Sequence, residues 1–134
     1  MYKTILVPID LSHPEQGSKT LRIAGMIGGE GSRVIALYVA ADVPGFVTVE
    51  LPKGLLEKSL AKSRTDLEVV ADEAAAEAMI ETGHPSTKIL ECAEKTGADL
   101  IIVASHRPKL QDYFLGSTAA RVVRHAQCAV FVDR

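Results

Sequence analysis

Short apolar runs alternate with helix-length amphipathic segments along the whole chain, and this order constrains the fold more than any other feature. The runs are TILVPI at 4–9, RVIALYVA at 33–40, AEAMIET at 76–82, DLIIVAS at 99–105 and CAVFVD at 128–133. A strand that helices cover on both faces needs a nearly continuous apolar stretch. The sequence therefore predicts an α/β fold in which five strands and four helices alternate. Right-handed crossovers would join them into a doubly wound, Rossmann-like parallel sheet.

The ends of the elements are indicated by capping and turn residues. Ser12 and Glu15 match the Ser-x-x-Glu capping box, which predicts a helix that runs to Gly28. An irregular piece at 41–52 precedes a second helix. The segment at 76–82 has two interpretations, because its alanines favour a helix and its alternation of apolar and acidic residues favours an edge strand. We expect the strand.

Composition and charge narrow the class of protein. The 134 residues are most simply one domain spanning 1–134, and a net charge of −2 argues against nucleic acid as a partner. The charge is uneven, since residues 104–134 hold five Lys and Arg against two Asp and Glu, which is +3 and leaves −5 for residues 1–103. A local basic excess of this size fits a small anionic ligand.

The surroundings of the protein are predicted from its apolar runs and cysteines. No apolar run approaches the ~18 residues of a membrane span, so we expect no membrane partner. Cys92 and Cys128 lack metal-ligand spacing and are interpreted as small core residues in a reducing compartment. The expected location is the cytoplasm.

A ligand crevice is expected where the winding of the sheet reverses, beyond the carboxyl ends of the first and fourth strands. The loops at that place are PIDLS at 8–12 and ASHRPKLQDYFLGSTAA at 104–120. Asp10 ends the first strand and could accept hydrogen bonds from ribose hydroxyls. Alternatively, it is a loop carboxylate stabilised by the dipole of the following helix.

The second loop carries groups that suit a phosphate. Gly116, Ser117 and Thr118 open the last helix, where free backbone N–H groups attract anions and two hydroxyls add donors. The alternative is that Ser117 simply caps the helix. Arg107 could make two parallel hydrogen bonds to a phosphate or be a solvated loop cation. His106 could donate to a phosphate or ribose oxygen or fill a turn.

Several classes of enzyme are excluded by missing motifs. No Gly-x-x-x-x-Gly-Lys-[Ser/Thr] sequence exists, and the glycines at 28–31 follow the first helix, where a dinucleotide fingerprint does not occur. The first strand ends in a single carboxylate, which is too few for a phosphoacceptor receiver. No Ser-His-Asp or Cys-His signature is present. We expect no catalytic residues and no metal site.

Three stretches resemble the universal stress protein family over essentially the whole chain: ILVPID at the start, HPSTKILECAEKTGADLIIVASH in the middle and LGSTAARVVRHAQCAVFVDR at the end. The resemblance implies a five-stranded parallel sheet in the order 3-2-1-4-5, of the Rossmann-like HUP class. It also implies a homodimer that pairs through the last strand at 128–133.

Many members of the family bind ATP through Gly-x-x-Gly, nine residues, then Gly-[Ser/Thr]. Here the last pair falls on Gly116 and Ser117, whereas Ala104 and Arg107 stand at the first two glycine positions and eight residues separate Arg107 from Gly116. The chain is similar instead to a subgroup with Ser-His-Arg-Pro, matched at 105–108. This subgroup resembles the F and G types of enterobacteria and is also associated with adenine nucleotides.

The resemblance implies a role for each residue of the crevice. Asp10 would meet the ribose, and Pro8, Ile9 and Val39 would flank the adenine. Val103 and Ala104 would approach the base through their backbone, and Gly116, Ser117 and Thr118 would hold phosphate. Ser105, His106 and Arg107 complete the expected site.

The leading hypothesis is a cytoplasmic, dimeric stress protein that binds ATP or AMP, with or without Mg²⁺, as a ligand that stabilises or switches the fold. Two alternatives stay open. One is an interaction module that has lost the nucleotide. The other is a weak ATPase or autophosphorylating protein, with Ser117 or Thr118 as the phosphate acceptor.

Overall fold

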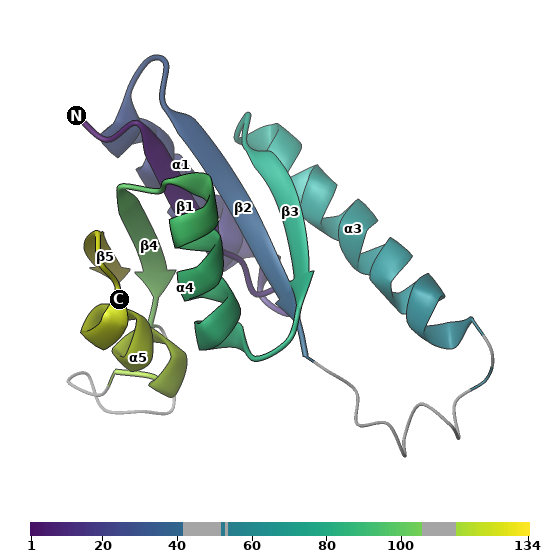
Figure 1. Ribbon diagram of the computed structural model, residues 1–134. Helices are drawn as coiled ribbons and strands as arrows, with labels where there is room; N and C mark the ends of the chain where they lie inside the picture. Colours follow the sequence, from purple (N-terminus) through teal and green to yellow (C-terminus); the bar gives the residue numbers. More distant parts are fainter. Residues whose placement is uncertain (42–51, 53, 106–114) are drawn as a thin grey trace.

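The computed structural model describes residues 1–41, 52, 54–105 and 115–134. Within them, five strands form one sheet in the order β3-β2-β1-β4-β5 (Figure 1). Every neighbouring pair is parallel, as expected. The winding therefore reverses between β1 and β4. The strands are β1 Thr4–Pro8, β2 Arg33–Ala40, β3 Glu77–Thr82, β4 Leu100–Ala104 and β5 Ala129–Asp133.

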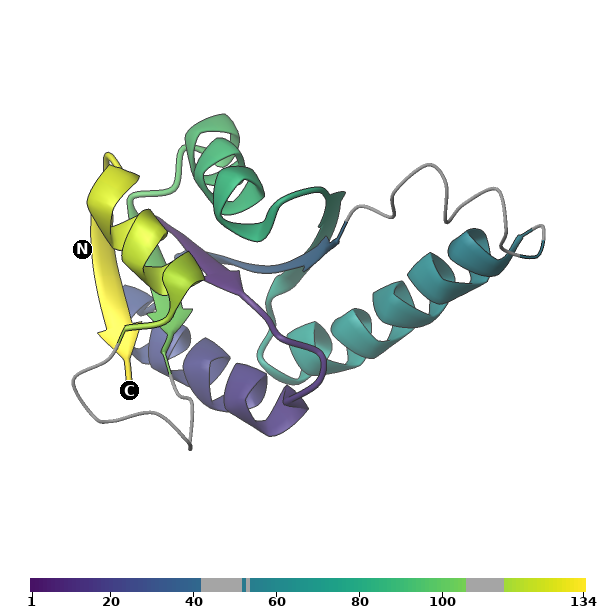
Figure 2. The same ribbon diagram turned by 90° about the horizontal axis from the view of Figure 1, so that it is seen from below.

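Helices cover both faces of this sheet, and Figure 2 shows the three layers in cross-section. One face packs against α1 and α3, and the other packs against α4 and α5. The four helices of the described residues are α1 Pro14–Gly28, α3 Leu55–Glu73, α4 Pro85–Thr96 and α5 Ser117–His125. None of the helices in these ranges has the length and hydropathy that crossing a bilayer requires.

The two cores are separated by the alternation of side chains along each strand. Ile5 and Val7 of β1 lie in the core under α1 and α3, and Leu6 lies in the core under α4 and α5. All three side chains are 0% exposed. Burying one such side chain stabilises the fold by roughly 1.5–3 kcal/mol. The continuous apolar runs in the sequence are thus explained by burial on both sides.

The segment after α3 forms a strand, as expected. β3 pairs with β2 over Glu77–Thr82 and lies at the edge of the sheet. Ala78 and Ile80 pack against one core, and Met79 packs against the other. Tertiary packing of alternate side chains therefore outweighs the local helix preference of alanine.

The predicted capping box at the start of α1 is wrong. His13 is the N-cap residue, with φ −133° and ψ 69°, and no side chain caps the helix. The backbone N–H of Ser12 donates to Oδ1 of Asp10 at 2.9 Å instead. The turn that Asp10 makes delays the helix by one residue, so Pro14 takes the first helical position.

The two cysteines lie where the sequence places them. Cys92, on α4, is buried in the core between this helix and the sheet, and Cys128 packs partly buried against the same core. Burial raises the pKa of both thiols. Both thiols are therefore largely protonated at neutral pH and poorly nucleophilic.

One carboxylate fixes the start of the central strand pair. Oδ2 of Asp99 accepts a hydrogen bond from the Lys3 N–H at 2.9 Å, and Oδ1 accepts one from the Thr4 N–H at 3.0 Å. In return the Asp99 N–H donates to the Thr4 carbonyl at 2.9 Å. These backbone hydrogen bonds hold the pKa of Asp99 below its ordinary value. The carboxylate joins β1 to the turn before β4.

We expect Asp99→Asn to lower the melting temperature at pH 7, because the substitution removes the negative charge and replaces Oδ2, which accepts from the Lys3 N–H, by an NH₂ group that cannot accept. A lowered pKa in the folded state means that the carboxylate stabilises the fold above its ordinary pKa of 3.8, and that this contribution disappears as the pH falls through the folded value. The difference in melting temperature between the two proteins should therefore shrink in acid. Asp66→Asn, in an exposed pair with Lys62, is the control and should change little.

A second prediction concerns the packing of α1 on the end of β1. A Cβ at Gly17 would lie 3.1 Å from Cγ2 of Ile9, whereas a Cβ at Gly25 of the same helix meets nothing within 4 Å. Gly25→Ala should stabilise the protein by up to ~1 kcal/mol through helix propensity. Gly17→Ala should gain less or destabilise it, because Ile9 must move. Urea unfolding measures both, and equal gains would contradict the tight contact.

Candidate functional site

A cavity of about 600 Å³ opens at the carboxyl ends of β1 and β4, where the winding reverses. This volume lies within the range of small-molecule sites in proteins. Segments that are far apart in the chain form its walls. The predicted site residues that line it are Pro8, Ile9, Asp10, Val39, Val103, Ala104, Ser105, Gly116 and Thr118.

The loop after β1 presents a carboxylate at the mouth of the cavity. The Ile9 N–H donates to the Leu37 carbonyl at 2.8 Å, which continues the β1–β2 ladder beyond the strand end. Asp10 is exposed, and its Oδ1 accepts from the Ser12 N–H at 2.9 Å. Its Oδ2 has no hydrogen bond to any other described residue. One carboxylate oxygen is thus held by the turn, and the other is available to a ligand in the cavity that Asp10 lines.

Much of the rest of the lining is apolar. Val39 and Tyr38 come from the end of β2, and Pro85 and Ile89 come from the start of α4. Val103 of β4, which is 3% exposed, also lines the cavity. A flat apolar ring system fits between such side chains better than a charged group does.

The start of α5 gives the third wall. Gly116 is the N-cap residue, with φ −60° and ψ 154°, and Ser117 is the first helical residue. No side chain caps this helix, so the interpretation of Ser117 as the N-cap is wrong. Gly116, Thr118 and Ala119 line the cavity, whereas Ser117 is exposed and does not. The N–H groups of the first turn have no acceptor within a helix and carry its positive end.

Two predicted site residues, His106 and Arg107, lie outside the described residues. Among the described lining residues the charged side chains are Asp10 and Glu15, both carboxylates. Positive potential in this part of the site comes from helix N-termini. The part of the chain that the structure describes contains no group of three or more His, Cys, Asp or Glu side chains that could hold a metal ion.

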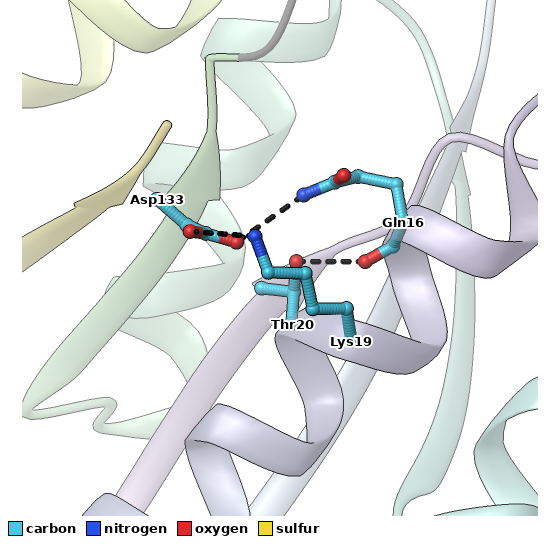
Figure 3. A network of polar contacts seen from close by, with 4 residues as sticks. All are labelled: Gln16, Lys19, Thr20 and Asp133. Carbon is cyan, nitrogen blue, oxygen red and sulfur yellow. Dashed lines mark hydrogen bonds and ion pairs between the residues drawn. The ribbon is translucent and has the colours of Figure 1, made fainter.

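Sequence reasoning missed the contribution of the first helix. Gln16, Gly17 and Thr20 of α1 line the cavity, together with His13 and Glu15 at its start. Gln16 and Thr20 lie one turn apart on the same side of the helix, and this polar pair on a largely apolar face was the available signal. Oγ1 of Thr20 donates to the Gln16 carbonyl at 2.9 Å (Figure 3).

A polar network joins this helix to the last strand. Nε2 of Gln16 donates to Oδ2 of Asp133 at 3.2 Å, and Nζ of Lys19 lies 3.3 Å from Oδ1 of the same carboxylate (Figure 3). The backbone carbonyl of Asp133 accepts from the Ser105 N–H at 2.9 Å. The cavity wall from α1 and the wall from β4 are therefore both attached to one residue of β5.

Relatives and solved structures match the chain over its length. Universal stress protein G of Escherichia coli O157:H7 is 29% identical to this chain, and the match covers 100% of both proteins. The solved structure of the hypothetical protein MJ0577 is 27% identical, with a TM-score of 0.79 over 99% of this chain and 96% of that one.

Two more distant structures were solved with adenine nucleotides. A universal stress protein in complex with cAMP is 21% identical, with a TM-score of 0.65 over 99% of this chain and 97% of that one. A universal stress protein from Archaeoglobus fulgidus in complex with dAMP is 17% identical, with a TM-score of 0.64 over 99% and 98%. At these identities the likeness is one of fold.

The family model described as the universal stress protein family matches residues 1–134. The strand order and the full-length relatives agree with that match. The chain belongs to the universal stress protein family.

Proposed function

We propose that this protein binds an adenine nucleotide, ATP or AMP, in the cavity between the ends of β1 and β4. The observation that carries the proposal is the combination of walls in one space of about 600 Å³. Apolar side chains suit a purine, a free carboxylate oxygen suits ribose hydroxyls, and the start of α5 suits phosphate. The nucleotide complexes of two proteins with the same fold support this assignment.

In this proposal each residue takes the role that the family resemblance implies. Pro8, Ile9 and Val39 flank the base, and Asp10 accepts from the ribose through the oxygen that the turn leaves free. Val103 and Ala104 border the base through their backbone. The phosphates meet Gly116, Thr118 and the backbone N–H of Ser117, with Ser105, His106 and Arg107 completing the loop. Mg²⁺ would enter with the phosphates of ATP, because it binds phosphate oxygens and few protein groups.

The nucleotide acts here as a ligand that stabilises the native state. Binding adds RT ln(1 + [L]/Kd) to the free energy of unfolding, so occupancy follows the nucleotide concentration of the cytoplasm, where we place the protein. Because the walls come from both halves of the chain, a bound nucleotide would favour the complete fold over partly opened states.

Asp10→Asn tests the ribose contact. Asparagine keeps an oxygen for the Ser12 N–H and therefore preserves the turn, but it replaces the free acceptor by an NH₂ group. We expect about tenfold weaker binding of AMP in calorimetry, with an unchanged melting temperature without ligand. Glu15→Gln, which removes the other carboxylate of the described lining, is the matched control and should not weaken binding.

A thermal-shift comparison decides the function as a whole. ATP or AMP should raise the melting temperature of the wild-type protein more than GMP and CMP do. If no adenine nucleotide raises it, the nucleotide proposal fails. Recovery of a partner protein without nucleotide would then favour an interaction module, and phosphate release or a phosphopeptide at Ser117 or Thr118 would indicate enzymatic activity.

We also propose that the protein is a homodimer that pairs through 128–133. Among the residues that the structure describes, β5 is an edge strand with no strand on its outer side, and Phe131 on it is 40% exposed. An exposed edge of this kind pairs readily with a second copy, which completes its hydrogen bonds.

Light scattering on Phe131→Lys tests the dimer. The variant should shift the wild-type dimer toward monomer, because two lysines would meet across the twofold interface. Val69→Lys on α3, where the native valine is 56% exposed, is the control and should stay dimeric. A monomeric wild-type protein would contradict the proposal.

A further inference from the structure

The carboxylate of Asp133 is nearly buried at the end of β5, and it is the starting point of this inference. Its side chain is 11% exposed, whereas the side chain of its partner Lys19 is 47% exposed. A carboxylate that loses this much water needs hydrogen bonds to both oxygens. Lys19 supplies one, and the Gln16 amide supplies the other.

This pairing orients Gln16. An amide group has two N–H donors and one oxygen acceptor. One N–H of Gln16 is committed to Asp133, so the carboxylate fixes which end of the amide faces β5 (Figure 3). Gln16 lines the cavity and Asp133 does not. The amide of a cavity-lining residue is therefore held by a residue outside the lining.

Asp133 also positions a second wall. Its backbone carbonyl accepts from the Ser105 N–H at 2.9 Å, in the register that pairs it with Ala104. Ala104 and Ser105 line the cavity. The penultimate residue of the chain thus sets the position of the α1 wall through its side chain and of the β4 wall through its backbone.

The charge of this group is compatible with an anionic ligand. Lys19 lies 3.3 Å from Asp133, so the pair carries no net charge behind the cavity wall. Gln16 itself is neutral. The oxygen of the Gln16 amide can only accept a hydrogen bond. The donors that an adenine nucleotide offers to it are the sugar hydroxyls and the amino group of the base. Asp10 and Gln16 line the cavity from the same segment of chain, which favours the sugar.

We propose that Gln16 accepts a hydrogen bond from a sugar hydroxyl of the bound nucleotide through Oε1, and that Asp133 is the positioning residue that holds its amide in this orientation. The proposal rests on the proposed nucleotide function and adds a polar contact from the first helix. Gln16 thereby distinguishes ligands that carry the hydroxyl from those that lack it.

Calorimetry with three ligands tests the contact. AMP, 2′-deoxy-AMP and 3′-deoxy-AMP are titrated into the full-length wild-type protein and into Gln16→Leu, which keeps the side-chain volume. We expect AMP to bind about fivefold more weakly to the variant. One of the two deoxy analogues should bind equally to both proteins, because the hydroxyl that Gln16 meets is missing. Gln127→Leu, at an exposed site outside the cavity, is the matched control and should bind all three like the wild type.

A double-mutant cycle tests the positioning role. Asp133→Ala should weaken AMP binding by about two- to threefold, and the double variant with Gln16→Leu should bind no more weakly than Gln16→Leu alone. The side-chain amide signals of Gln16 in nuclear magnetic resonance spectra should shift in Asp133→Ala. If Asp133→Ala does not fold, Asp133→Asn replaces it, since its NH₂ group takes the place of one of the two oxygens that Gln16 and Lys19 contact and cannot accept from either donor.

The outcomes separate this inference from the proposed function. If the wild type binds no adenine nucleotide, the proposed function fails. Two results with a wild type that binds AMP would contradict the contact between Gln16 and the sugar. In one, Gln16→Leu binds each of the three ligands as tightly as the wild type does. In the other, its affinity for all three ligands falls by the same factor. Additive losses in the cycle would overturn the positioning role of Asp133 alone.

Discussion

The burial of β1 between two helical layers is the constraint on which the rest of the structure depends. Three consecutive side chains, Ile5, Leu6 and Val7, are completely buried, and they alternate between the two cores. A strand of this kind must lie inside the sheet, so the chain winds from it to β2 and β3 and then returns to its other side with β4 and β5. The helices that follow β1 and β4 in the structure, α1 and α5, pack on opposite faces of the sheet, and the cavity opens at the carboxyl ends of these two strands.

The chemistry of that cavity divides between apolar walls and backbone groups. Val39, Val103 and Ile89 make a surface for a flat ring, and the described charged side chains of the lining are carboxylates. An anionic group in this part of the site is therefore stabilised by helix N-termini rather than by side-chain cations. The Asp133 network adds a mechanical link, because it joins the last strand, whose outer edge we propose as the dimer interface, to two walls of the ligand site.

The sequence predicted the strands more accurately than it predicted the hydrogen bonds at the helix ends. The five strands are found within a residue or so of their expected ends, because apolar runs report burial directly. The hydrogen bonds at the helix starts were harder to predict from the sequence. The capping box was wrong because Asp10 takes the Ser12 N–H for its own turn. Gly116, not Ser117, is the N-cap residue of α5. Ser117 is a residue type that often occupies the N-cap position, but the backbone here begins the helix at Ser117 and leaves the cap to the residue before it.

The sequence by itself determined the layers of the sheet and the loops that gather at its carboxyl edge, since periodic burial is encoded residue by residue along each strand. Only the tertiary structure decided which side chains complete the site. Gln16 and Asp133 lie 117 positions apart, and neither belongs to a motif that names the other. Their contact depends on where the start of α1 lies relative to the end of β5. This placement is set by packing across the whole sheet, which no local pattern records.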